Sequence, residues 1–224
     1  DITLSGRALS SDYLVGRTVC LDLNANQQCD SGEPQTTTDS QGRFSFTLPE
    51  TQQADARQAW AILAAPAISS KAAARSVNQA TPTLLGYVDG AEFVVSPYTH
   101  QLVTSTDPEQ RKTQYQSSIA TKEKQLIANE LGLTTQEASA QKLFGDYLAA
   151  GDTHSAALAD EAATKEQQLI EASALQAELA AALATDNPQG WQLVTVSIRN
   201  LREYNRNQDI WQPLRLQEVV HSTR

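Results

Sequence analysis

Residues 37–48 read Thr-Thr-Asp-Ser-Gln-Gly-Arg-Phe-Ser-Phe-Thr-Leu, and this stretch decides the class of fold. Asp39 and Gly42 are residue types that favour a tight turn. After the turn, Phe44, Phe46 and Leu48 alternate with polar residues, which places them on one face of an extended strand. The stretch therefore predicts a β-hairpin whose second strand buries an apolar face.

Further strands are predicted on both sides of this hairpin. Residues 2–4 and 18–23 are short apolar runs bounded by turn residues. Residues 58–65 fit a buried strand or a short helix, and their position among strands favours the strand. Residues 83–88 and 92–95 flank Asp89-Gly90, a dipeptide typical of a second hairpin. The first 96 residues thus predict six or seven strands, enough for a small antiparallel β-sandwich.

The composition changes after Ser96-Pro97, where Ala, Gln, Glu and Lys become frequent. Apolar spacing and capping residues predict helices over 97–105, 108–131, 138–150 and 153–184. Residues 190–206 fit a helix, although Val194, Val196 and Ile198 also alternate as in a strand. We expect an α+β fold with two domains, an antiparallel β-sandwich over 1–96 and an α-helical bundle over 97–224.

Length and charge exclude several classes of protein. The 224 residues are 40% hydrophobic, which is enough for a packed core. Lys and Arg total 17 against 26 Asp and Glu, so the net charge of -9 and the lack of a basic cluster argue against a nucleic-acid partner. The longest apolar run, near residues 60–68, contains Pro66 and spans about half a bilayer, so no transmembrane segment is expected.

The chain start and the cysteines indicate an exported protein. The sequence begins with Asp1 and contains no Met, which suggests a trimmed product whose signal peptide or lipid anchor lay upstream. The two cysteines, Cys20 and Cys29, flank a polar loop, and in an exported protein such a pair predicts one disulfide. We expect a periplasmic, outer-membrane-anchored or extracellular location.

The loop between the cysteines and beyond them has the spacing of a calcium site. Residues 22–33 read Asp-Leu-Asn-Ala-Asn-Gln-Gln-Cys-Asp-Ser-Gly-Glu. Counting from Asp22, oxygen-bearing side chains occupy the positions that ligate calcium in an EF-hand loop, and position 7 would contribute a backbone carbonyl. The predicted ligands of a structural Ca²⁺ are Asp22, Asn24, Asn26, Gln28, Asp30 and Glu33.

The loop also departs from the EF-hand pattern. Gln27 stands at position 6, where a glycine normally allows the sharp turn, and Cys29 stands at position 8. The flanking segments are predicted strands, so we expect an EF-hand-like loop on a β scaffold, fixed by the disulfide. The alternative is a polar turn without an ion.

Two runs of residues carry a resemblance to known families. They are Val19-Cys20-Leu21-Asp22-Leu23-Asn24, continuing through Asn26, Cys29, Asp30, Gly32, Glu33 and Pro34, and then Thr37-Thr38-Asp39 with Gly42, Phe44 and Phe46. Over about residues 3–50 the chain resembles bacterial carboxypeptidase-regulatory-like (transthyretin-like) domains and the calcium-binding B-type repeats of surface adhesins. The resemblance implies that Asp22, Asn24, Asn26, Asp30 and Glu33 hold calcium and that Asp39 shapes the hairpin.

A second resemblance concerns residues 93–103, Phe-Val-Val-Ser-Pro-Tyr-Thr-His-Gln-Leu-Val, with Leu131-Gly132-Leu133 further on. This order is similar to the segment and helical region that follow such a β-domain in secreted or lipid-anchored proteins of Gram-negative bacteria. Tyr98 and His100 depart from the usual residues. Most members of that group have no assigned activity.

The sequence favours a binding or structural role over catalysis. No common catalytic motif is present, and His100 beside Ser96, Tyr98 and Thr99 is interpreted as a capping or surface residue. We expect a non-catalytic, calcium-stabilised module of an exported bacterial surface protein or lipoprotein, acting in adhesion, assembly or ligand binding. Its partner would be a surface protein or a polysaccharide. The alternatives are an accessory carbohydrate-binding domain of a secreted hydrolase and a small secreted enzyme.

Overall fold

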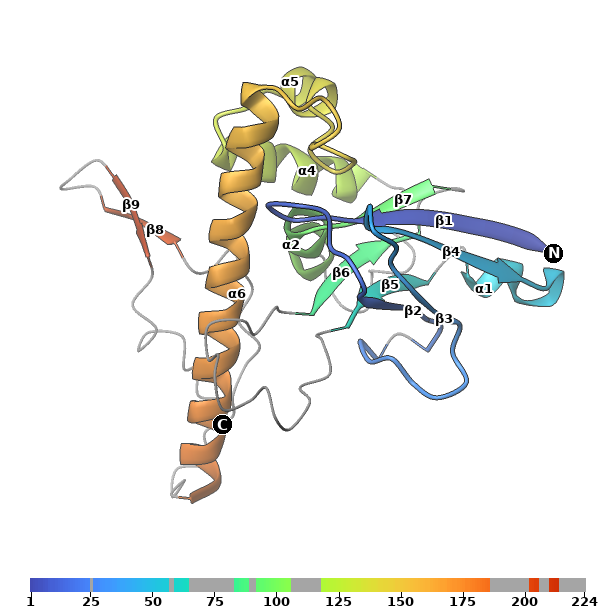
Figure 1. Ribbon diagram of the computed structural model, residues 1–224. Helices are drawn as coiled ribbons and strands as arrows, with labels where there is room; N and C mark the ends of the chain where they lie inside the picture. The colour runs from blue at the N-terminus through green and yellow to red at the C-terminus, as the bar shows by residue number, and fades with distance from the viewer. Residues whose placement is uncertain are drawn as a thin grey trace. The chain divides into compact units, whose positions relative to one another are not determined.

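The computed structural model describes residues 1–24, 26–56, 59–64, 83–88, 92–105, 118–185, 202–205 and 210–213. These residues form an α+β fold, as the sequence predicts (Figure 1). The elements are β1 (Ile2–Ala8), β2 (Thr18–Asp22), β3 (Gln35–Thr37), β4 (Arg43–Leu48), η1 (Glu50–Gln52), α1 (Gln53–Ala56), β5 (Trp60–Leu63), β6 (Leu84–Tyr87), β7 (Glu92–Val95), α2 (Pro97–Ser105), α4 (Ser118–Glu130), α5 (Thr135–Ala140), α6 (Thr153–Thr185), β8 (Arg202–Asn205) and β9 (Ile210–Pro213).

The chain divides into two compact units, Asp1–Glu166 and Gln167–Arg224. The first unit holds β1 to β7 together with α2, α4, α5 and the first part of α6. In the second unit, β8 and β9 pair antiparallel, with Tyr204 opposite Trp211. That residues 1–96 form a domain of their own stays a prediction.

The first sheet has the strand order β4-β1-β7. β1 pairs antiparallel with β4, with Ile2 opposite Leu48, and parallel with β7. Phe44, Phe46 and Leu48 of β4 are only 4%, 3% and 4% exposed. The predicted buried face of this strand is therefore confirmed, and its alternate residues form the polar outer face of the sheet.

The second sheet has the strand order β3-β2-β5-β6, and all its pairs are antiparallel. β2 lies inside the sheet, with Cys20 opposite both Gln35 and Ile62. β3 pairs with β2 as far as Cys20, and β5 pairs with it up to its last residue, Asp22, which is opposite Trp60. The sheet thus gives a rigid starting point to the loop that follows β2.

Both predicted hairpins are wrong in their pairing, although their strands exist. The turn after β3 forms, since the N–H of Gly42 donates to the carbonyl of Asp39 at 3.0 Å and Gly42 has φ of 70°. However, β3 pairs with β2 whereas β4 pairs with β1, so the turn passes the chain from one sheet to the other. β6 and β7 likewise belong to different sheets. Alternation identifies a buried face, but it does not identify the neighbouring strand.

The helices agree with the sequence in part. α2 and α6 occupy the predicted ranges, and α4 covers the described part of the range 108–131, whose residues 108–117 lie outside the described residues. The predicted helix 138–150 is wrong beyond Ala140: α5 begins with a capping box at Thr134 and ends at Ala140 in a series of turns. The predicted helix 190–206 is wrong at 202–205, which form β8, and its other residues lie outside the described ranges.

A shared apolar core joins the helices of the first unit to the start of the chain. The buried members of the core are Leu9, Tyr98, Leu102, Ile127, Ala128, Ala138, Leu143, Tyr147, Leu158 and Ala162.

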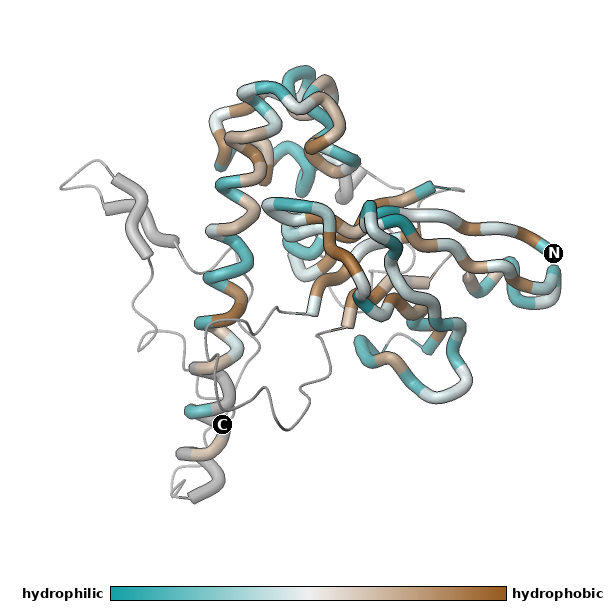
Figure 2. The backbone as a smooth tube through the Cα atoms, in the orientation of Figure 1, coloured by the Kyte–Doolittle hydropathy of each residue, from teal (hydrophilic) through white to brown (hydrophobic). Residues whose placement is uncertain are grey.

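The helices carry mixed polar and apolar residues. Figure 2 shows hydrophobic and hydrophilic residues alternating in short stretches along α6. None of the helices in the described ranges is long and apolar enough to cross a membrane.

Hydrogen bonds between side chains and from a side chain to the backbone also join α2, α4 and α6. The Gln101 amide nitrogen on α2 donates to Glu130 on α4 at 2.8 Å, and its oxygen accepts from Lys165 on α6 at 2.6 Å. The Tyr98 hydroxyl donates to the Leu158 carbonyl at 2.5 Å. Because these groups are buried or partly buried, their pairing offsets a desolvation cost and fixes how α2, α4 and the start of α6 pack.

Candidate functional site

A disulfide closes the loop that follows β2. Cys20 of β2 and Cys29 of the loop are bonded, with Cα atoms 5.7 Å apart, so the predicted bridge is present. Cys20 is fully buried in the second sheet, where it packs with Ile62 and Leu85. Closing so short a loop stabilises the fold by about 2–3 kcal/mol in the chain-entropy model. The bridge anchors the middle of the loop to the sheet.

The loop wraps around the carboxylate of Asp22. This side chain is fully buried at the end of β2. One of its oxygens accepts the N–H of Asn26 at 3.1 Å, and the other accepts the N–H of Gln27 at 2.8 Å. Charge-assisted bonds of this kind are stronger than neutral ones. Asp22 therefore organises the first half of the loop.

Gln27 adopts the backbone conformation that a glycine usually provides. Its φ is 64°, in the left-handed region that few residues other than glycine enter. Gln27 occupies loop position 6, where EF-hand loops turn sharply at a glycine. The loop thus makes the turn expected of a calcium loop although it lacks the glycine.

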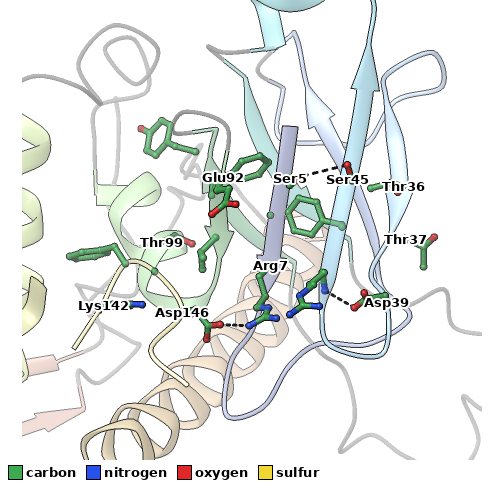
Figure 3. A pocket seen from close by; sticks show the side chains of 18 residues that line it. Ser5, Arg7, Thr36, Thr37, Asp39, Ser45, Glu92, Thr99, Lys142 and Asp146 are labelled. Carbon is green, nitrogen blue, oxygen red and sulfur yellow. Dashed lines mark hydrogen bonds and ion pairs between the residues drawn. The ribbon is translucent and has the colours of Figure 1, made fainter. Parts of the chain in front are cut away.

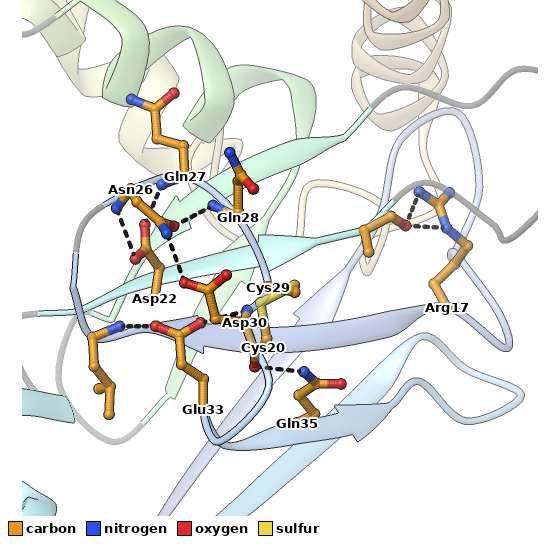
Figure 4. The surroundings of a disulfide bond; sticks show 12 residues. Arg17, Cys20, Asp22, Asn26, Gln27, Gln28, Cys29, Asp30, Glu33 and Gln35 are labelled. Carbon is orange, nitrogen blue, oxygen red and sulfur yellow. Dashed lines mark hydrogen bonds between the residues drawn. A yellow bond between two sulfur atoms is a disulfide. The ribbon is translucent and has the colours of Figure 1, made fainter.

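The two asparagines and Asp30 form a hydrogen-bonded group (Figure 4). The amide nitrogens of Asn24 and Asn26 both donate to Oδ2 of Asp30, at 2.8 and 2.6 Å. The amide oxygens of the same residues accept backbone N–H groups of Asn26 and Gln28, at 3.0 and 2.8 Å. The two amide oxygens and Oδ2 of Asp30 therefore all accept hydrogen bonds from donors within the loop.

Glu33 closes the loop by binding both of its ends. Its Oε1 accepts the N–H of Leu23 at 2.8 Å, and its Oε2 accepts the N–H of Asp30 at 3.0 Å. The Asp30 carbonyl in turn accepts the Gln35 amide at 3.1 Å. In Figure 4 the Gln28 side chain points away from Asp22 and Asp30. Five of the predicted ligand side chains therefore share one network, and Gln28 joins it through its backbone.

The calcium site itself stays a prediction. Within the described ranges, no group of three or more His, Cys, Asp and Glu side chains stands close enough to hold a metal ion. The carboxylates of Asp22, Asp30 and Glu33 instead accept N–H groups of the loop. A cation at this position would have to replace some of these donors at the carboxylate oxygens.

The segment around His100 has a structural role at the start of α2. Ser96 and Thr99 cap the helix reciprocally, with the Ser96 N–H donating to Oγ1 of Thr99 at 2.8 Å. Nδ1 of His100 accepts the N–H of Leu85 at 3.1 Å, and burial lowers the pKa of His100 to about 4. The imidazole is therefore neutral at pH 7, and this polar group ties β6 to α2.

A second polar group, which the sequence did not predict, lies beside the first sheet. The Arg7 guanidinium of β1 donates to the Asp146 carboxylate and, at 3.2 Å, to the Tyr13 hydroxyl. The Tyr13 hydroxyl donates to Asp146 at 3.1 Å, and Arg7 stacks over the Tyr13 ring at 4.5 Å. Burial and the charge of Asp146 raise the pKa of Tyr13.

This group borders an open hollow of about 800 Å³ on the first unit (Figure 3). Burial lowers the pKa of Arg7, but the hydrogen bond and charge of Asp146 more than offset it, and the pKa is raised overall. Arg7 is therefore a cation at any pH at which the protein is folded. Arg7 and Asp146 are far apart in the chain, so no local pattern in the sequence points to their contact.

No protein-family model, curated protein or solved structure matches this chain.

Proposed function

We propose that the chain is a non-catalytic, calcium-stabilised module of an exported bacterial surface protein or lipoprotein, acting in adhesion, assembly or ligand binding. The observation that carries this proposal is the loop of residues 22–33, pinned by the disulfide and wrapped around a buried carboxylate. The disulfide supports export, because such bonds persist in oxidising compartments.

The donor types of the loop favour calcium over other metals. Carboxylates and amides supply oxygen only, and both cysteine sulfurs are used in the disulfide. Calcium accepts six to eight oxygen ligands at flexible distances. Three carboxylates, Asp22, Asp30 and Glu33, predict moderate or weak affinity, which suits the millimolar calcium of an extracellular setting.

We also propose the finer architecture. The two sheets would pack as a transthyretin-like β-sandwich, and the helical region after Ser96 would form the bundle that follows it. The apolar face of β4 and the buried β2, β5 and β6 support the sandwich. The shared core of α2, α4, α5 and α6 supports the helical part.

A thermal melt of the oxidised protein in EDTA and in millimolar calcium tests the metal. A ligand that binds only the folded state stabilises it by RT ln(1 + [L]/Kd), about 2.7 kcal/mol at a hundredfold excess. We expect a calcium-dependent rise in Tm that magnesium at the same concentration does not reproduce.

Asp30→Asn provides the test variant because Asp30 is only half-buried, whereas Asp22→Ala removes a fully buried carboxylate that also folds the loop. Asp12→Asn is the control: the Asp12 carboxylate also accepts a hydrogen bond, here from the backbone N–H of Tyr13, but it lies outside the calcium loop. The rise should shrink in Asp30→Asn and persist in Asp12→Asn. An equal Tm in EDTA and in millimolar calcium, with calcium in large excess over the protein, would contradict the metal site.

A further inference from the structure

We infer that the hollow beside the first sheet binds an uncharged oligosaccharide. This inference rests on the ligand-binding part of the proposed function, but it does not depend on calcium. Its basis is the set of hydroxyl groups, paired charges and apolar surface that one face of the β4-β1-β7 sheet brings together with the segment 142–146.

The hollow has the size of a small-molecule site. Its volume of about 800 Å³ lies within the usual range of roughly 300–1,000 Å³ for ligand pockets. Strands β1, β4 and β7 contribute its lining, together with β3 and the turns after α5. All of these segments belong to the first unit, so the hollow is formed within one compact body.

Hydroxyl groups line the sheet face in register. Ser5 of β1 stands opposite Ser45 of β4, and their hydroxyls are 3.5 Å apart. On its other side Ser5 is aligned with Glu92 of β7. Thr36 and Thr37 of β3 also line the hollow. Because sugar hydroxyls both donate and accept hydrogen bonds, a row of hydroxyl and carboxylate side chains suits them.

The charges of the lining are balanced, which argues against a strongly charged ligand. Three cationic side chains face three carboxylates, so an anion or a cation alone would meet like charges. Arg7 and Arg43 stand directly opposite each other across β1 and β4, an arrangement that destabilises a sheet unless carboxylates compensate it. The charged lining residues are Arg7, Arg43, Lys142, Asp39, Glu92 and Asp146.

One carboxylate holds Arg7 in place and a second lies beside Arg43, so part of the site is preformed. Asp146 pairs with Arg7 (Figure 3). Asp39 lies near Arg43, and hydrogen bonds from the N–H groups of Gln41 and Arg43 lower the pKa of Asp39. Because Arg7, Asp146 and Asp39 are fixed before a ligand arrives, binding would not require their ordering.

Other charged groups of the hollow are available to a ligand. The side chains of Arg43, Glu92 and Lys142 are exposed, and none of the three makes a hydrogen bond or ion pair within the described part of the chain. Charged donors and acceptors form stronger hydrogen bonds to hydroxyls than neutral groups do. Phe144, another residue that lines the hollow, adds apolar surface for the C–H faces of a sugar ring.

Isothermal titration with cellohexaose, laminarihexaose and chitohexaose tests the inference, with hexagalacturonate as the charged counterpart. Each titration is run in EDTA and in millimolar calcium, so that a failure of the calcium site is seen separately from a failure of saccharide binding. We expect at least one neutral hexasaccharide to bind, and hexagalacturonate to bind more weakly.

Glu92→Ala and Arg43→Ala should each weaken that binding about tenfold. Their matched controls are Glu50→Ala and Lys122→Ala, which remove exposed charges outside the hollow and should leave the affinity unchanged. A Tm within 2 °C of the unaltered protein, which surface substitutions of this kind normally keep, shows that each variant is folded. Three results overturn the inference: no neutral hexasaccharide binds, only hexagalacturonate binds, or the hollow variants bind as well as their controls.

Discussion

Replacing Gln27 by glycine tests whether the loop backbone is already set in its calcium-loop conformation. The φ of Gln27 is 64°, where a side chain costs about 1–2 kcal/mol. Glycine removes this cost, but it loses about 0.5–1 kcal/mol more backbone entropy on folding. We therefore expect Gln27→Gly to raise the free energy of unfolding by about 0.5–1 kcal/mol, the difference between these two effects.

The measurement is a urea titration and a thermal melt in EDTA and in millimolar calcium. For a chain of this size, 1 kcal/mol shifts Tm by about 2–4 °C, so a rise of about 1–4 °C is expected. Because the turn at Gln27 is held by a bond within the chain itself, from its N–H to Asp22 at 2.8 Å, we expect the gain to be the same in both buffers. The apparent Kd for calcium should then change less than about twofold, which corresponds to 0.4 kcal/mol.

Two further variants make the result specific. Lys142 is the other described non-glycine residue with positive φ, at 52°, and Lys142→Gly should give a similar gain in stability without any link to calcium. Gln27→Val should lose stability, because a β-branched residue tolerates this region poorly. If Gln27→Gly instead lowers stability in EDTA by about 0.5–1 kcal/mol, as glycine does at ordinary positions, the left-handed turn is absent from the calcium-free loop and the reasoning fails.

Three other predictions concern the disulfide, a turn and the partly buried ring of His100. Replacing both Cys20 and Cys29 by serine should cost about 2–3 kcal/mol in urea unfolding, and an unchanged midpoint would show that the bridge does not constrain the unfolded chain. Gly42→Ala should destabilise the protein more than Gly16→Ala, since both positions have positive φ but only at Gly42 would the new Cβ approach a backbone carbonyl, at 2.5 Å; equal losses would refute the close contact. The His100 pKa of about 4 lies below its unfolded value, so its neutral ring favours the fold fully above about pH 6.5, and this stability is lost as the pH falls toward 4. Because part of the residue stays exposed, we expect a loss of about 1–2 kcal/mol relative to His100→Gln between pH 7 and 4.5, and parallel pH profiles would contradict it.

The strands could be predicted from the sequence because each one carries its own signal. The alternation of Phe44, Phe46 and Leu48 identifies a buried face without any knowledge of the neighbours. The pairing of strands has no such local signal. β4 and β7 both pair with β1, at the start of the chain, and the turn between Asp39 and Gly42 only lets the chain change sheets. A tight turn between two strands was therefore a poor guide to their partners.

The end of α5 shows how a distant contact overrides local propensity. Residues 138–150 have the composition of a helix, but Lys142 takes positive φ and Gly145 follows it. The turns that result carry Asp146 to the guanidinium of Arg7 and the hydroxyl of Tyr13. An ion pair between residues so far apart in the chain leaves no periodic pattern, so the sequence predicted a longer helix.

The calcium loop and the hollow differ in the same way, since only the first has a local signal in the sequence. The ligands predicted for calcium follow one another within a single loop, so their spacing is visible in the sequence. The conformation of Gln27 was not predictable, because this residue type normally avoids positive φ. The hollow draws its lining from β1, β3, β4, β7 and the turns after α5, and only the tertiary fold brings these segments together.

One short segment connects the two proposed sites. β3 begins two residues after Glu33 and is held by β2 and by the Gln35 amide, which donates to the carbonyl of Asp30. Thr36 and Thr37 of the same strand line the hollow. A cation that orders the loop would therefore also order one wall of the saccharide site, and by linkage a bound saccharide would raise the affinity for calcium by the same factor. The calcium and EDTA titrations measure this factor directly, and equal saccharide affinities in both buffers would mean that β3 is already fixed by its pairing with β2.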